Sequence, residues 1–261
     1  MDTLMLVAAG ALAGIFAGLL GIGGGAIIVP VLALFFEHQG ANPDAVMQAA
    51  IGTSLATIVF TAIASVRAHQ ARGAVRWPVF WQLTPGIVAG GLVGAGIAHR
   101  LPGHFLKTLF GVFLLLVALQ MAVGKKPKSQ RPPLETRWMW VAGGVIGALS
   151  SLFGIGGASI SVPFLLWCSV PTVEAIGTAA AIGLPIALAG TVGYVVTGFY
   201  ATGLPRWSIG YVVLPPFFGI VIASVLSAPL GARIAHRLPQ MTLQRIFAVF
   251  LALLGLRLFF R

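Results

Sequence analysis

The chain has 261 residues, of which 58% are hydrophobic and only 8% charged, with a formal net charge of +11 and a mean hydropathy of +1.00. Soluble domains carry about 25% charged residues, so this composition excludes an ordinary soluble domain and indicates a polytopic membrane protein. The basic residues stand at the ends of apolar segments without a nucleic-acid-binding motif, so we expect them to face lipid headgroups and water, not nucleic acid. Because Cys168 is the sole cysteine, an intrachain disulfide and a multi-cysteine metal site are excluded.

Ten apolar segments are predicted along the chain, and several reach the roughly 20 residues that a membrane-spanning helix needs. The first is expected to remain in the mature protein, because Asp2 stands where a cleaved signal peptide would carry basic residues. The second is too short to span alone, so the second and the seventh are expected to be half-helices. The segments cover residues 3–20, 26–36, 45–66, 78–98, 105–123, 138–153, 158–170, 174–198, 208–230 and 243–260.

The polar stretch at residues 124–137 divides the chain nearly in half. Its three prolines and several charges predict a solvated linker. We expect this linker to be cytoplasmic and to join a first transmembrane repeat, residues 1–123, to a second, residues 138–261.

The two halves repeat several motifs in the same order. GIFAGLLGIGGGAIIVPVL at 14–32 aligns without gaps with GALSSLFGIGGASISVPFL at 147–165, and ten of the 19 positions are identical. An internal duplication of this kind is typical of transporters built from two related halves. The other matches are AIGTS at 50–54 with AIGTA at 175–179, Trp77 and Pro85 with Trp207 and Pro215, and IAHRLP at 97–102 with its copy at 234–239.

Each half opens with a glycine-rich interruption of an apolar helix, GIGGG in the first half and GIGG in the second. Glycine weakens a helix by about 1 kcal/mol per residue, and the prolines that follow, Pro30 and Pro163, each remove a backbone donor. The half-helix after such a break begins with free N–H groups and partial positive charge, which favours a bound anion near the midplane. The alternative is two hinges that only move. In either case Pro30 and Pro163 are the expected hinge residues. The predicted ligand positions are Gly23, Gly24, Gly25, Gly156 and Gly157.

Small hydroxyl side chains inside the apolar segments form the second part of the predicted site. Thr53 and Ser54 follow a glycine in the first half, and Thr178 follows one in the second, so their hydroxyls could donate to an anion. The alternative is that they bond the backbone of their own helix, as Ser and Thr often do in membranes. The same two interpretations apply to the serines that flank the second interruption, which are Ser150, Ser151, Ser159 and Ser161.

The five acidic residues all lie at segment ends or in the linker. Proton relays and cation sites usually keep a carboxylate in the middle of a span, so this distribution favours an anionic substrate. Glu174 is the one acid that could couple protons, and sodium held by backbone carbonyls is left open. The chain contains no HExxH, GxSxG or nucleotide-binding loop, so we expect no enzyme, no cofactor and no metal.

The paired GIGGG-x-x-x-VP motif, the IGTS motif and the length resemble the TauE/SafE sulfite exporter family over nearly the whole chain. The resemblance implies an inner-membrane transporter of sulfur-containing or organic anions, such as sulfite, sulfoacetate or other sulfonates, with about eight spans in two repeats. Ala158 and Ala179 depart from the motifs in the second half, so the two half-sites are expected to be unequal. Carried over motif by motif, the resemblance points to Gly21, Gly23, Gly24, Gly25, Pro30, Thr53, Ser54, Gly154, Gly156, Gly157, Pro163 and Thr178.

We therefore expect an all-α polytopic membrane protein with about 8–10 membrane segments in two homologous halves. Counting Lys and Arg on each side gives 11 to 5 for inverted and for parallel repeats alike. Inverted repeats are favoured because shared midplane sites commonly arise that way. The expected function is secondary transport of a small anion by alternating access, with an anion channel and a non-transporting membrane subunit as alternatives. The expected partners are the anion and the bilayer; a proton or sodium as coupling ion and a homodimer are left open.

Overall fold

The computed structural model describes residues 8, 10–15, 24–123, 136–235 and 240–259. Besides the helical residues 8 and 10–15, this part of the chain contains nine α-helices and one two-stranded antiparallel hairpin. The helices are α2 (Gly25–His38), α3 (Pro43–Gln70), α4 (Trp77–Arg100), α5 (Gly103–Val123), α6 (Thr136–Phe153), α7 (Ala158–Trp167), α8 (Thr172–Gly198), α9 (Leu214–Ala235) and α10 (Gln240–Phe259), and the strands are β1 (Ser208–Ile209) and β2 (Val212–Val213).

The expected all-α polytopic membrane fold is confirmed. Four helices in the described ranges are long and apolar enough to cross a membrane: α3, α4, α5 and α8. By contrast, α2 has 14 residues and α7 has 10. At 1.5 Å per residue they are about 21 and 15 Å long, against about 30 Å of hydrocarbon, so neither spans a bilayer alone. The prediction of two half-helices is therefore correct.

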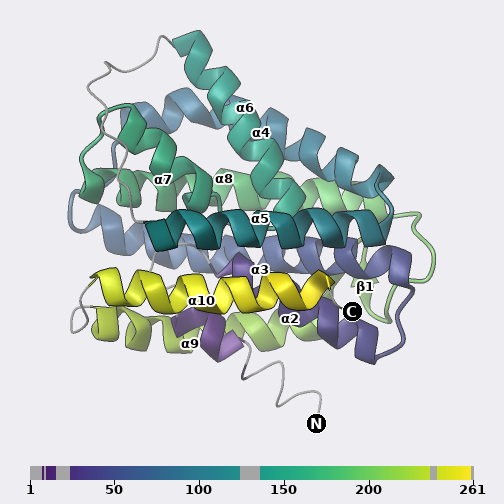
Figure 1. Ribbon diagram of the computed structural model, residues 1–261. Coiled ribbons are helices and arrows are strands. Elements are labelled where there is room, and N and C mark those ends of the chain that lie inside the picture. Colours follow the sequence, from purple (N-terminus) through teal and green to yellow (C-terminus); the bar gives the residue numbers. More distant parts are fainter. Residues whose placement is uncertain (1–7, 9, 16–23, 124–135, 236–239, 260–261) are drawn as a thin grey trace.

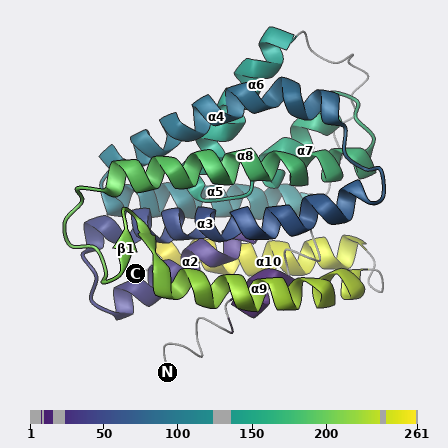
Figure 2. The ribbon, with the colours of Figure 1, turned by 180° about the vertical axis from the view of Figure 1, so that it is seen from behind.

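The helices lie roughly side by side in a layered bundle (Figure 1). Helices α3 and α8 pack against each other through the middle, with α4 and α6 on one side and α9 and α10 on the other (Figures 1 and 2). Helix α5 packs against α10, and α7 packs against α8. Each half therefore contributes one long helix to the centre of the bundle.

Glycines allow the closest helix contacts, as the four-residue spacing in α4 predicts. A Cβ added at Gly86, Gly90 or Gly94 would collide with a backbone carbonyl of α6. Residues 10–15 make a similar contact with α9, where the Ser227 hydroxyl donates to the carbonyl of Ala11 over 2.9 Å. These contacts leave no room for side chains, so the two helix pairs are fixed by backbone proximity.

The hairpin is the main departure from the predicted segments. The apolar stretch from residue 208 begins as strands in which Ser208 pairs with Val213, and α9 starts only at Leu214. Trp77 is the first residue of α4, whereas Trp207 lies before the hairpin, so these two tryptophans do not occupy matching positions. The reason is a contact with a distant helix. The Tyr211 N–H donates to the carbonyl of Tyr194 in α8 over 3.2 Å, and this hydrogen bond holds the hairpin against the bundle.

Candidate functional site

Both predicted helix breaks are present. Helix α2 is preceded by Gly24 with φ 72° and ψ −13°, and α7 is preceded by Gly157 with φ 76° and ψ −17°. These are left-handed conformations that favour glycine, so the motif needs glycine at both positions for a backbone reason. The other two predicted glycines of the first break, Gly21 and Gly23, lie outside the described residues.

The second break is complete in the structure and ends α6 with a defined turn. Gly154 has φ 65°, its N–H donates to the Ser151 carbonyl, and the N–H of Ile155 donates to the Ser150 carbonyl over 3.0 Å. This is a Schellman arrangement, which satisfies the last carbonyls of a helix and turns the chain away. Helix α6 therefore stops at Phe153 although apolar residues continue.

Helix α7 begins with free backbone donors. The N–H groups of Ile160 and Ser161 both donate to the Gly157 carbonyl, over 3.0 and 2.7 Å. No side chain caps the helix, and within the described residues the N–H groups of Gly156 to Ser159 have no hydrogen-bond partner. These donors and the helix dipole place partial positive charge at Gly157, inside the apolar bundle.

Four serine hydroxyls beside this break are buried and lack hydrogen-bond partners among the described residues. They belong to Ser150 and Ser151 at the end of α6 and to Ser159 and Ser161 in the first turn of α7. The Ser150 and Ser161 oxygens lie 3.3 and 3.6 Å from the position that a Cβ of Gly157 would take. Leaving a buried hydroxyl unsatisfied costs about 1–3 kcal/mol, so this group needs an explanation beyond packing. The sequence left open whether these serines bond the backbone of their own helix or donate to an anion. Within the described residues, none of the four hydroxyls bonds its own helix backbone.

Thr53, Ser54 and Thr178 have partners in other parts of the chain. The Ser54 hydroxyl donates to the Gly154 carbonyl over 2.9 Å, so α3 of the first half holds the break of the second half. Thr53 Oγ1 accepts from the N–H of Val213, just before α9, and Thr178 Oγ1 accepts from the N–H of Arg76, just before α4. Each threonine thus holds the segment before a helix of the other half. Their role as donors to an anion stays a prediction, since in this arrangement their oxygens serve the protein.

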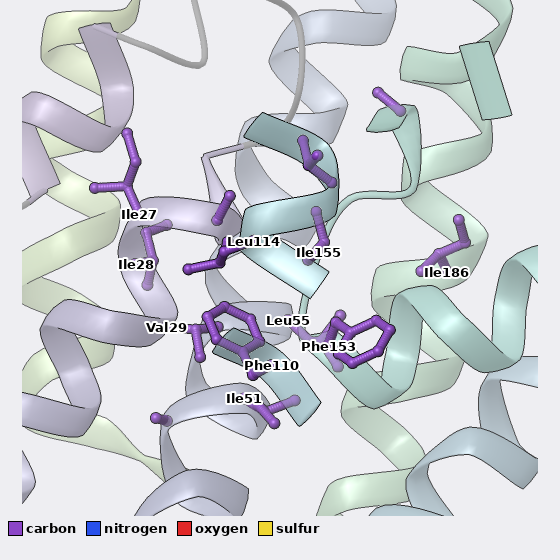
Figure 3. Packing of buried hydrophobic residues seen from close by; sticks show 14 of the residues in the cluster. Ile27, Ile28, Val29, Ile51, Leu55, Phe110, Leu114, Phe153, Ile155 and Ile186 are labelled. Carbon is purple, nitrogen blue, oxygen red and sulfur yellow. The ribbon is translucent and has the colours of Figure 1, made fainter. Parts of the chain in front are cut away.

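The two breaks are neighbours. A Cβ added at Gly25, the first residue of α2, would collide with the Gly154 carbonyl, and one added at Gly154 would come within 2.9 Å of Val29. Figure 3 shows the apolar packing next to this contact, with Val29 beside Phe110 and Phe153 to their right; the ring centroids of Phe110 and Phe153 are 6.4 Å apart. A pocket shared by both breaks remains a prediction, but the backbone of one break does touch the helix that follows the other.

The two prolines lie inside the half-helices. Pro30 is the sixth residue of α2 and Pro163 the sixth of α7, and both helices continue beyond them. Each proline leaves the carbonyl four residues earlier, that of Ala26 or Ser159, without its helical N–H partner. The hinge role assigned to them stays a prediction.

Formal charges stay away from the buried interior in the part of the chain that the structure describes. The buried polar side chains there are Gln, Ser and Thr, without Asp, Glu, Lys or Arg. Glu174 forms an ion pair with Arg76, and Glu37 forms one with Lys107 over 2.8 Å. All four side chains are partly exposed, so the potential at the second break comes from backbone dipoles and hydroxyls.

The chain is similar to known membrane proteins over nearly its whole length. It matches the family profile "Sulfite exporter TauE/SafE" over residues 6–258. It is 34% identical over 259 residues to a "Probable membrane transporter protein" of Haemophilus influenzae, covering 99% of this chain and 98% of that protein. It is also 29% identical to the "Probable membrane transporter protein MJ0441" of Methanocaldococcus jannaschii, covering 97% and 93%, and 28% identical to the "Probable membrane transporter protein YunE" of Bacillus subtilis, covering 100% and 98%. Together with the broken-helix fold, these matches show that the chain is a membrane transporter that belongs to the sulfite exporter TauE/SafE family.

Proposed function

We propose that this protein is a secondary transporter that moves small sulfur-containing or organic anions, such as sulfite, sulfoacetate or other sulfonates, across the inner (plasma) membrane by alternating access. The name of the matching family supports sulfite as the first candidate. The observation that carries the proposal is the second break. There, backbone N–H groups that have no partner among the described residues adjoin the buried hydroxyls of Ser150 and Ser161 at Gly157.

The chemistry of this break suits an anion. A helix N-terminus offers several N–H donors and partial positive charge without a side chain, and this compensates an anion that has left water. Hydroxyls of serine add directional donors at little steric cost. The absence of buried carboxylates among the described residues avoids repulsion of the substrate.

Alternating access would use the contacts between the halves. In this structure Thr53 and Thr178 each hold the segment before a helix of the opposite half. If one half moves against the other, these two hydrogen bonds have to break, and the groups that form them have to find other partners. Helices α2 and α7, which adjoin the site, are short and contain proline. Rocking of this kind about a midplane site is a known mode of transporters with related halves.

The test is transport by the purified protein alone in liposomes. We expect saturable uptake of labelled sulfite or sulfoacetate, inhibition by the unlabelled anion, and counterflow when the liposomes are preloaded with it. Conductance without counterflow would instead assign an anion channel, and no flux of any anion from a well-folded sample would assign a subunit of a larger complex. Imposed proton and sodium gradients, applied separately, identify the coupling ion.

A further inference from the structure

The serines at the second break have no counterparts in the first. In the gapless alignment of residues 14–32 with 147–165, the four serine positions of the second half correspond to alanine, glycine or isoleucine in the first half. The aligned pairs are Ala17 with Ser150, Gly18 with Ser151, Ala26 with Ser159 and Ile28 with Ser161. The backbone motif is thus retained while the hydroxyls occur on one side only.

The described residues of the first break are correspondingly apolar. A Cβ added at Gly24 would lie 3.5 Å from the Cδ1 methyl of Ile28, whereas one added at Gly157 would lie 3.6 Å from the hydroxyl of Ser161. Ile28 is buried, as is Ala26. Other groups also adjoin these points: the Ala13 carbonyl lies 3.2 Å from the Gly24 position, and the Ile186 methyl of α8 lies 2.3 Å from the Gly157 position. The difference between the two half-helices is therefore at the aligned side chains, where Ile28 presents a methyl group and Ser161 a hydroxyl.

We propose that the anion binds at the second break alone, at the N-terminus of α7, and that Ser150 and Ser161 determine its specificity. This inference rests on the proposed function and assigns that function to one break. Ser159, in the first turn of α7, contributes a third hydroxyl. The first break is then the structural partner, whose helix α2 packs against the binding loop at Gly154.

The donor set indicates the class of anion. Hydroxyls from α6 and from α7 converge on the helix N-terminus, so the ligand needs several acceptor oxygens pointing in different directions. A pyramidal or tetrahedral sulfur oxyanion, such as sulfite or a sulfonate head, presents three such oxygens, whereas a planar carboxylate presents two. We therefore expect the serines to favour sulfite and methanesulfonate over acetate.

The chain provides a matched control for each serine. Ser151 is equally buried and equally without a partner among the described residues, yet its hydroxyl lies 3.0 Å from the position of a Gly190 Cβ, toward α8. Ser151→Ala therefore removes a nearby buried hydroxyl that, unlike those of Ser150 and Ser161, is not among the atoms nearest to the Gly157 position. Ile28→Ala tests truncation at the position of the first break that matches Ser161.

The experiment measures sulfite, methanesulfonate and acetate binding by purified full-length protein, using ligand-induced thermal stabilisation and calorimetry. We expect Ser150→Ala and Ser161→Ala each to weaken sulfite binding about tenfold or more, and to reduce the preference for sulfite over acetate. Ser151→Ala and Ile28→Ala should change sulfite affinity less than about twofold. Without ligand, Ser150→Ala and Ser161→Ala should melt at the same or a higher temperature, because an unsatisfied hydroxyl is removed; a purely structural serine would give a lower one.

The outcomes separate the two proposals. If the wild-type protein binds and transports sulfite but both serine variants bind it normally, the anion lies elsewhere and this inference fails while the transport function stands. If Ile28→Ala weakens binding as much as Ser161→Ala, both breaks take part and the one-sided site is wrong. If a folded wild-type protein binds and transports none of the sulfur oxyanions, the proposed function itself fails.

Discussion

The first and second glycine breaks have the same backbone role and different side-chain chemistry. Gly24 and Gly157 have nearly the same left-handed conformation, and each starts a half-helix with a proline at its sixth position. Hydroxyls without partners in the described chain lie near Gly157, beside the Ile186 methyl, whereas the α2 side chain nearest to Gly24 is the apolar Ile28. A duplicated backbone motif thus preserves helix geometry, while a few side chains decide which copy offers donors to a ligand.

The largest expected effect comes from the residue that starts each half-helix. Ala158 occupies in α7 the place that Gly25 has in α2, but only at Gly25 would a Cβ collide with the Gly154 carbonyl. We expect Gly25→Ala to lower the free energy of unfolding by about 2–4 kcal/mol, because backbone must move to make room. Thermal unfolding of the purified protein in detergent measures this loss.

The reciprocal change Ala158→Gly is the control for that prediction. It removes a methyl group and lowers helix propensity, so we expect a loss below about 1 kcal/mol. Equal losses for both variants would show that the two half-helices start in equivalent surroundings, contrary to the structure.

The next effect concerns the hydroxyl that holds the second break. Ser54→Ala leaves the buried Gly154 carbonyl without its 2.9 Å donor, which we expect to cost about 1–3 kcal/mol. Ala179 is the aligned residue of the second half and has no hydroxyl, so this support is also one-sided. Thermal unfolding again provides the measurement.

Thr61→Ala is a suitable control for Ser54→Ala. The Thr61 hydroxyl donates to the Ile58 carbonyl of its own helix, and we expect its removal to cost less than about 1 kcal/mol. A Ser54 variant as stable as the Thr61 variant would argue that the break needs no support from α3.

The two threonines of the IGT motifs test the contacts between the halves. The hydrogen bond from the Val213 N–H to Thr53 is buried, whereas the one from the Arg76 N–H to Thr178 is only partly buried, because Arg76 is exposed. Water can therefore replace the lost acceptor more easily at Arg76 than at Val213. We therefore expect Thr53→Val to cost about 1–2 kcal/mol and Thr178→Val about half as much, in the same unfolding assay. The reverse order would contradict the burial difference between the two contacts.

The smallest expected effect is that of the ion pair between Arg76 and Glu174. With side chains 44% and 33% exposed, an isolated surface pair contributes about 0–1 kcal/mol, and less in high salt. Glu174→Gln should therefore leave anion binding largely intact and change stability only slightly. A large loss of sulfite affinity, measured by calorimetry, would instead assign a direct coupling role to this acid.

Several features of the fold follow from local properties of the sequence. The runs of apolar residues predicted most helix positions to within a few residues, because each run is bounded by polar residues, glycine or proline. The breaks before α2 and α7 were also predictable, since only glycine adopts the left-handed conformation of Gly24 and Gly157 at no steric cost. Local patterns failed where a distant segment decides the outcome, as at residues 208–213.

The sequence by itself determined the membrane class, the positions of the broken helices and the candidate glycines, because these depend on hydropathy and backbone freedom near each residue. Only the tertiary structure decided which hydroxyls already have a hydrogen-bond partner. The Ser54 hydroxyl donates to the Gly154 carbonyl, and Thr178 Oγ1 accepts from the Arg76 N–H. The hydroxyls of Ser150 and Ser161 lie near Gly157 without a partner in the described residues. The physical reason is that a hydroxyl bonds whatever group packing brings within about 3 Å, and packing joins residues that are far apart in the chain.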